Sequence, residues 1–133
     1  MDTLISNVTI VTMNERMEVL FGGHVGITDG KIVHIAKVPP KEAPAEIIDG
    51  TGMVLMPGLI NCHTHLATTA LRSLCDELSL TESLEQQLQK EAKMDSRIAK
   101  AAATIAAAEC LRFGTTSVSD LYYYPDATAE VIA

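Results

Sequence analysis

The chain has 133 residues, 47% of them hydrophobic, so it can form one ordinary core, whereas a complete eight-stranded α/β barrel needs about 200 to 250 residues. Seventeen acidic and ten basic residues give a net charge of −7, and no cluster of lysine or arginine is dense enough to follow a phosphate backbone, which argues against nucleic-acid binding. No apolar stretch approaches the roughly 18 residues that cross a bilayer, so we expect a cytoplasmic protein without a membrane partner.

The first 56 residues are typical of a small β-sheet. The stretch LISNVTIVTM is rich in β-branched residues, and Asp29-Gly30 separates two apolar runs, which is a strong signal for a β-hairpin. The segment KVPPKEAPAE contains three prolines and indicates a surface loop before a last strand at Ile47 and Ile48. Strands of this total length enclose little core of their own.

The stretch MPGLINCHTHL places two histidines one residue apart at the end of an apolar run. In a strand alternate side chains share a face, so His63 and His65 point the same way from Cα atoms about 6 to 7 Å apart, and both imidazoles can reach one metal ion. Thr64 and Cys62 point away, and we expect Cys62 to be a small buried residue. The apolar residues around the Pro-Gly pair favour a buried strand. The alternative for an arbitrary His-x-His is one core and one surface histidine.

From Pro57 onward strand and helix signals alternate, which favours a parallel α/β arrangement. Asp95 can cap a helix over about 96–112, and Gly114 can take the left-handed position after it. The run AAATIAAAE is a good helix former whose small side chains permit close packing against a sheet. The β-branched run at 115–120 then predicts a second strand.

Three segments together resemble the amidohydrolase superfamily of metal-dependent hydrolases. MPGLINCHTHL is similar to the first, metal-binding barrel strand, TALRSLCDEL to the stretch after it with Arg72 retained, and LRFGTTSVSDLYYYPD to the second strand and its loop. The resemblance is closest to the branch of methylthioadenosine and S-adenosylhomocysteine deaminases and triazine chlorohydrolases. It implies an α/β fold in which residues 1–56 supply strands of a composite β-sandwich and residues 57–133 the first βα units of a TIM-type (β/α)8 barrel.

The length of the chain bears on this expectation. About two βα units fit after His65, and the chain ends at Ala133 inside what reads as a helix, without a glycine cap. We therefore expect the N-terminal portion of a longer enzyme. In the family the C-terminus completes the small sandwich, so the sheet of this chain should have an unpaired edge.

The resemblance implies a metal site. In the family a divalent ion, usually zinc and sometimes iron or another ion, is held by the two histidines of this motif together with a histidine and an aspartate from later strands. His63 and His65 are the matching metal ligands here. The acid/base residue is a glutamate on a later strand in the family, and its counterpart would lie beyond residue 133.

The resemblance also suggests one substrate contact. The nucleoside deaminases carry a glutamate that holds the ribose hydroxyls, and Glu91 matches it if one residue is deleted between Leu84 and Glu91. Glu91 can equally be a solvated charge beside Lys90 and Lys93 on a polar helix. A tryptophan common in this helix of the family is absent, and Ser83 occupies the best-matching position, so a pocket wall is expected to differ.

Two further features lie at the end of the predicted second strand. Asp120 stands where barrel loops carry active-site groups, yet an acid there can equally hydrogen-bond to nearby backbone. The three consecutive tyrosines at 122–124 can line a pocket for an aromatic ring, although they cannot all face it, and at least one should pack structurally.

The expected protein is a hydrolytic deaminase of an adenosine-type small molecule, S-adenosylhomocysteine or methylthioadenosine, that cleaves a non-peptide C–N bond. A triazine or cytosine-like aminohydrolase or chlorohydrolase is the alternative within the enzyme class. The alternative of another class is a non-catalytic truncated fragment, and we expect the 133-residue chain alone to be inactive because it offers only two metal ligands. The residues leave open whether the protein forms a homo-oligomer.

Overall fold

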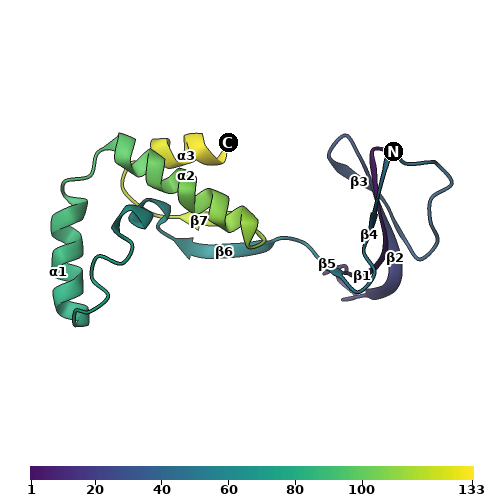
Figure 1. Cartoon of the computed structure of the whole chain (residues 1–133), viewed down its shortest axis with the longest axis horizontal. Helices are drawn as coiled ribbons and strands as arrows, with labels where there is room; N and C mark the ends of the chain where they lie inside the picture. The colour runs from purple at the N-terminus through teal and green to yellow at the C-terminus, as the bar shows by residue number, and fades with distance from the viewer. The chain divides into compact units, whose positions relative to one another are not determined.

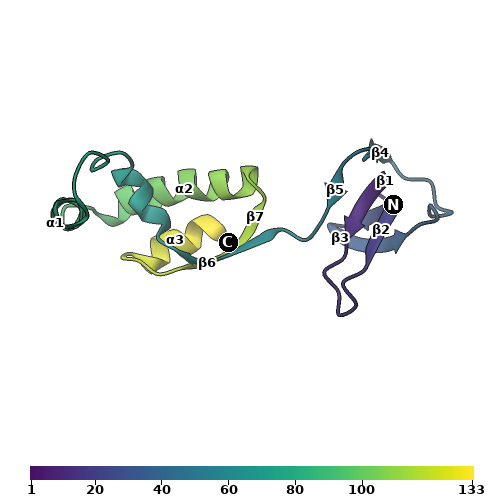
Figure 2. The same ribbon diagram turned by 90° about the horizontal axis from the view of Figure 1, so that it is seen from below.

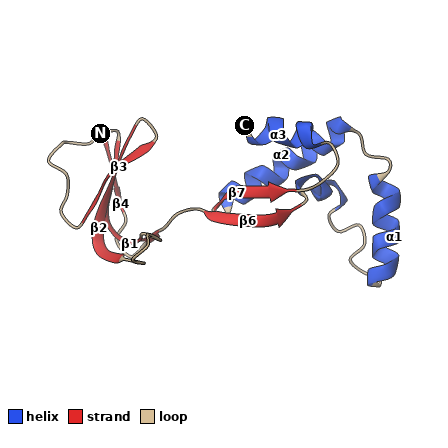
Figure 3. Cartoon of the chain, turned by 180° about the vertical axis from the view of Figure 1, so that it is seen from behind, coloured by secondary structure: helices blue, strands red, loops and turns tan.

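The computed structural model describes residues 1–133, which divide into two compact units, Met1–Pro57 and Gly58–Ala133 (Figure 1). The chain has a mixed α/β composition, with the first unit built of strands and the second of strands and helices (Figure 3). None of the helices combines the length and the apolar character that a membrane span needs. The α/β class expected from the sequence is thereby confirmed.

The first unit is a five-stranded sheet. Strands β3, β2, β1 and β4 follow one another across it, β5 also pairs with β1, and only β4 and β5 run parallel to β1. The strands are β1 (Thr3–Val11), β2 (Val19–Thr28), β3 (Lys31–Ala36), β4 (Glu46–Asp49) and β5 (Val54–Leu55). Asp29 and Gly30 join β2 to β3 with φ angles of 51° and 69°, as a type I′ hairpin turn requires. The predicted hairpin and the predicted strand at Ile47 and Ile48 are confirmed.

The core of this sheet is small. Val8, Ile10 and Val25 form its buried cluster, while Ile47 and Ile48 of β4 remain exposed. Strands β3 and β4 lie at the edges of the sheet. The thin core expected for so short a set of strands is therefore what the unit has.

The second unit contains a two-stranded parallel sheet and its helical connections. Between the strands the chain forms one 3₁₀ helix and two α-helices, and a third α-helix follows β7. Figure 2 shows the same elements from a second direction. The elements are β6 (Leu59–Thr64), η1 (Leu66–Leu71), α1 (Leu80–Glu91), α2 (Ser96–Arg112), β7 (Thr115–Asp120) and α3 (Pro125–Ile132). Parallel neighbours need such a crossover connection, so the alternation expected from Pro57 onward is confirmed.

Helix α2 supplies most of the core of the second unit. Its N-cap Asp95 accepts a hydrogen bond from the backbone of Ile98 at 2.8 Å, and Gly114 follows its end with a φ of 85°. Four alanines of one face are buried, and three of them, Ala99, Ala103 and Ala106, pack in clusters with Leu66 and Ala67 of η1. The helix predicted over 96–112 is confirmed. Its small side chains do pack closely, but more against η1 than against the sheet that we expected.

Two expectations about burial in β6 were wrong. Cys62 is exposed, and Leu59 and Ile60, expected in a buried strand, are 52% and 71% exposed. The physical reason is that β6 pairs with β7 alone, while α2 and α3 lie to one side of this pair in Figure 3. The extended conformation was predicted correctly, but the cover over its outer face was not.

Candidate metal centre

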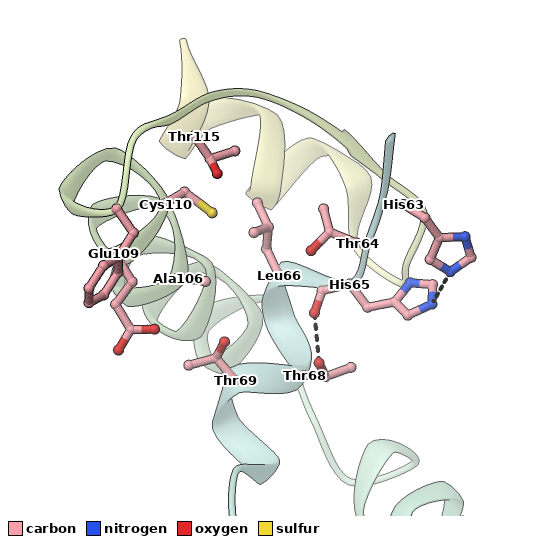
Figure 4. A pocket seen from close by; sticks show the side chains of 11 residues that line it. His63, Thr64, His65, Leu66, Thr68, Thr69, Ala106, Glu109, Cys110 and Thr115 are labelled. Carbon is pink, nitrogen blue, oxygen red and sulfur yellow. Dashed lines mark hydrogen bonds between the residues drawn. The ribbon is translucent and has the colours of Figure 1, made fainter. Parts of the chain in front are cut away.

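The two histidines of the His-x-His motif lie together at the C-terminal end of β6. His63 is in the strand and His65 directly precedes η1. Their Nε2 atoms are 3.2 Å apart, and the rings meet edge to face with centroids separated by 4.9 Å. Figure 4 shows both imidazoles on one side of the strand and Thr64 on the other, as the alternation of a strand predicts.

The end of β7 orients one of these rings. The Nδ1–H of His65 donates to the backbone carbonyl of Leu121, and the Leu121 N–H donates to the Thr64 carbonyl at 3.1 Å. We assign the proton to Nδ1 because the carbonyl oxygen can only accept, so the Nε2 of the neutral ring carries the lone pair. A histidine in this tautomer is suited to bind a metal through Nε2.

Asp120 and Thr68 hold the turn that follows His65. The backbone N–H of Leu66 donates to Asp120 Oδ1 at 2.7 Å, and the Thr68 hydroxyl donates to the His65 carbonyl at 2.7 Å (Figure 4). Of the two roles considered for Asp120, the hydrogen bond to nearby backbone is the one observed. Sequence reasoning missed the Leu121 carbonyl because every residue type carries the same carbonyl group.

The geometry of the pair fits a zinc ion. Zinc binds imidazole nitrogen at about 2.0–2.1 Å, so two nitrogens 3.2 Å apart would subtend about 100° at the ion, close to the tetrahedral angle. Without an ion, the same distance suits a hydrogen bond from the Nε2–H of His63 to the Nε2 of His65. No group of three or more His, Cys, Asp or Glu is placed to hold a metal, so the chain offers two ligands of the three or four that zinc sites use.

Glu91, the predicted substrate contact, lies in the wall of a cavity that His65 also lines. The cavity has a volume of about 450 Å3. It is lined by His65, Thr68, Gln87, Glu91, Leu121, Tyr122 and Tyr123. Glu91 is half-buried and accepts a hydrogen bond from the Gln87 amide at 2.8 Å, whereas Lys90 and Lys93 are exposed and form no ion pair with it. This environment differs from that of a fully solvated charge on a polar helix.

His65 also lines a second cavity. It has a volume of about 520 Å3 and runs from both histidines to Glu109 and Cys110 of α2 (Figure 4). Ser83, which stands where the family has a tryptophan, lines neither of these two cavities and instead borders a smaller one with Leu71 and Cys75. The replacement of the family's tryptophan by Ser83 therefore affects this smaller cavity and not the one that Glu91 lines.

The three tyrosines after β7 have different surroundings. The Tyr122 and Tyr123 side chains line the cavity beside Glu91, and the Tyr122 ring centroid is 5.8 Å from that of His65. Tyr124 instead starts α3 and donates its hydroxyl to the Met94 carbonyl at 2.8 Å. Burial, together with the nearby Glu91 carboxylate, raises the pKa of the Tyr122 hydroxyl, which therefore stays protonated at neutral pH. The expectation that not all three face one pocket is confirmed.

Comparison with known proteins begins with the family. Residues 54–132 match the model of the amidohydrolase family. The chain is 39% identical to the 5′-deoxyadenosine deaminase of Methanosarcina mazei and 36% identical to the 5-methylthioadenosine/S-adenosylhomocysteine deaminase of Nitratidesulfovibrio vulgaris. Each match covers 98% of this chain, which spans only about 30% of the length of these relatives.

Two solved structures are similar to the chain. One is a zinc-bound adenosine deaminase from Xanthomonas campestris, with a TM-score of 0.83 and 33% identity over 98% of this chain and 31% of that one. The other is the zinc complex of an atrazine chlorohydrolase from Arthrobacter aurescens, with a TM-score of 0.84 and 30% identity over 97% of this chain and 32% of that one. The similar proteins therefore include enzymes named for nucleosides and an enzyme named for a triazine.

Proposed function

This chain belongs to the amidohydrolase family, and from that premise we propose that it forms part of a metal-dependent deaminase of adenosine-type nucleosides. The candidate substrates are S-adenosylhomocysteine, methylthioadenosine and 5′-deoxyadenosine, which appear in the names of its relatives. The observation that carries the proposal is the pair of Nε2 atoms 3.2 Å apart, next to a cavity whose wall contains Glu91.

We propose that the two units contribute to a larger architecture. The parallel pair β6–β7 would be the first two strands of a (β/α)8 barrel, and the sheet of residues 1–57 would be part of a small β-sandwich. This chain spans about 30% of the length of its relatives, and two of the eight strands of a barrel are about the share that such a length would contain. Active sites of such barrels lie at the C-terminal ends of the strands, where both histidines stand.

His63 and His65 would hold one divalent ion, for which zinc is the leading candidate and iron or another divalent ion the alternative. When bound, an ion with an open position lowers the pKa of water toward 7 and so makes a nucleophile available at neutral pH. The Leu121 carbonyl keeps the His65 proton on Nδ1, which leaves Nε2 as the donor atom. The remaining ligands and the acid/base group would come from sequence outside this chain.

Glu91 would bind the sugar of the substrate. A half-buried carboxylate accepts hydrogen bonds from two neighbouring hydroxyls, and the ribose of an adenosine-type nucleoside presents such a pair. Glu91 and His65 both line the cavity, so a bound nucleoside would direct its aminated ring toward the histidines while its sugar contacts Glu91. The departing group would be ammonia.

The second candidate is a triazine or cytosine-like aminohydrolase or chlorohydrolase. The observation that favours it is the TM-score of 0.84 with the atrazine chlorohydrolase, which equals the similarity to the adenosine deaminase within 0.01. A sugar-free ring has no pair of hydroxyls for Glu91 to bind, so only the nucleoside candidate requires that residue.

The test uses a full-length protein in which this chain is followed by the further sequence that its relatives possess. We expect ammonia release from S-adenosylhomocysteine, methylthioadenosine and 5′-deoxyadenosine, with kcat/KM well above that for a sugar-free aminated triazine or cytosine. Equal or better turnover of the sugar-free rings would move the second candidate to first place. No hydrolysis of any of these compounds by the metal-loaded protein would contradict the proposal as a whole.

The 133-residue chain by itself should release no ammonia from these nucleosides, because two histidines without an acid/base partner do not make a catalytic centre. Measurable turnover by the purified 133-residue polypeptide would show that the chain is sufficient for catalysis. That result would overturn the assignment of the remaining ligands to sequence outside it.

A further inference from the structure

We propose that Gln87 and Tyr122 are positioning residues that hold the Glu91 carboxylate in the cavity wall and so set the preference for substrates with neighbouring hydroxyl groups. The inference rests on the proposed role of Glu91 as the sugar contact. Neither residue stood out in the sequence for this purpose, because each acts through Glu91 rather than through the ion or the ring.

Gln87 lies one helical turn before Glu91 on the half-buried face of α1. Its Nε2 donates to Glu91 Oε1 at 2.8 Å, which is the hydrogen bond that fixes this carboxylate in the structure. Helix α1 has no fully buried residue, and its leucines at 80, 84 and 88 are exposed. Little other packing restrains the Glu91 side chain, so loss of the Gln87 amide should let it rotate.

Tyr122 approaches the same carboxylate from the end of β7. Its ring lies beside the His65 imidazole, and its hydroxyl is buried, makes no hydrogen bond of good geometry and has Glu91 as its charged neighbour. Buried hydroxyls in proteins nearly always have a partner. A small rotation of Glu91 would supply one, because the carboxylate can only accept and a neutral phenol can donate.

The consequence concerns the choice of substrate. Held by the Gln87 amide, and by the Tyr122 phenol once Glu91 has turned toward it, the carboxylate would keep its remaining lone pairs for the cavity. Those lone pairs suit the two donors of a sugar diol. Because the Tyr122 ring also contacts His65, the diol site keeps a fixed position relative to the histidine pair. A sugar-free ring would bind without using this arrangement.

The experiment compares Gln87→Leu, Tyr122→Phe and Glu91→Ala in the full-length protein, with Gln86→Leu as the matched control on the exposed face of the same helix. Calorimetry on the metal-free protein gives the Kd of adenosine and of adenine, and kinetics give KM and kcat for the preferred nucleoside. Gln87→Leu and Tyr122→Phe should each weaken adenosine binding and raise the nucleoside KM by about three- to tenfold. Adenine binding and kcat should change less than about twofold.

The design separates two kinds of failure. If Glu91→Ala lowers adenosine and adenine binding equally, Glu91 is no sugar contact, and both the nucleoside assignment and this inference fall. If Glu91→Ala acts on adenosine alone while Gln87→Leu and Tyr122→Phe behave like Gln86→Leu, only the positioning inference is overturned.

A structural role would give a different pattern. Equal losses for adenosine and adenine, or a loss of metal content, in Gln87→Leu or Tyr122→Phe would show that the residue supports the fold and would overturn the inference. The double variant Gln87→Leu/Glu91→Ala should lose no more adenosine affinity than Glu91→Ala alone, since a positioning residue acts only through its partner. An additive loss would contradict the inference as well.

Discussion

The two halves of the candidate site differ in how the fold holds them. His65 directly follows β6, and its ring is fixed by a hydrogen bond to the Leu121 carbonyl. The turn after it is fixed by the bond from the Leu66 N–H to Asp120 and by the bond from the Thr68 hydroxyl to the His65 carbonyl. Glu91 is the last residue of a helix without a fully buried side chain and is held by Gln87. The metal half, His63 and His65, is thus anchored at the end of β6, whereas the substrate half, Glu91 on α1, depends on a few side-chain contacts.

This difference teaches where change is tolerated. A substitution near the histidines disturbs the ends of β6 and β7, the two strands of the second unit. It should therefore affect ion binding and stability together. A substitution on α1 can alter the cavity wall with little effect on the sheet. The following predictions test that separation, beginning with the largest expected effect.

The largest effect should come from the histidines themselves. If the proposed activity holds, His63→Ala or His65→Ala in the full-length protein should reduce kcat/KM to below about 1% of the parent value. A metal ligand matters more than the supporting groups, whose loss already costs about 10- to 100-fold. Ammonia release with saturating zinc measures this. Retention of most activity by either variant would mean that the pair is not essential.

Asp120→Ala should weaken the metal half through the turn after His65. The substitution leaves the partly buried Leu66 N–H without its acceptor, which costs about 1–3 kcal/mol, and zinc affinity should fall about 10- to 100-fold. Asp120→Asn keeps an acceptor oxygen and should lose less. Asp76→Ala, at an exposed position, is the control for loss of an acidic residue, and an equal effect in all three variants would refute the role of the hydrogen bond.

Ser79→Ala should affect the substrate half alone. Ser79 and Glu82 form a capping box at the start of α1, and loss of the cap costs about 1 kcal/mol of helix stability. We expect a modest fall in adenosine binding and an unchanged zinc content. A marked loss of zinc from Ser79→Ala would show that the two halves are coupled more tightly than the comparison implies.

The smallest effect concerns the ion pair between Arg72 after η1 and Glu109 of α2, both of which are largely exposed. The hydrogen bond from Arg72 lowers the pKa of Glu109 below its usual value, so the pair adds stability above that value and loses it as the pH falls through the lowered pKa. Arg72→Gln should therefore lower Tm slightly at pH 7. The difference should shrink as the pH falls through the lowered pKa of Glu109, and a difference that grows toward acid pH would contradict the sign.

The predictable parts of the fold are those with local signals. Asp95, the alanine run and Gly114 mark α2 to within a residue, and Asp29-Gly30 marks the hairpin, because caps and turns depend on neighbouring residues. Burial was harder to predict. The exposure of Cys62 and Leu59 depends on which strands and helices cover β6, and no local pattern states that.

In the candidate site, too, the features with a local sequence signal were predictable and those that depend on tertiary packing were not. Alternation in a strand was enough to bring His63 and His65 together. His65 and Glu91 line one cavity because of how the chain between them folds back. Residue patterns do not predict that fold, and only the family resemblance pointed to Glu91 as part of the site. The orienting carbonyl of Leu121 could not be read from the sequence because its side chain takes no part.

The most direct test of the central claim is the metal content of the purified full-length protein, measured by elemental analysis for the parent, His63→Ala/His65→Ala and the control His24→Ala/His34→Ala. Both pairs remove two histidines, but His24 and His34 lie in the sheet of the first unit. The account predicts about one divalent ion per chain in the parent and the control and almost none in His63→Ala/His65→Ala. Undiminished metal in His63→Ala/His65→Ala would contradict it.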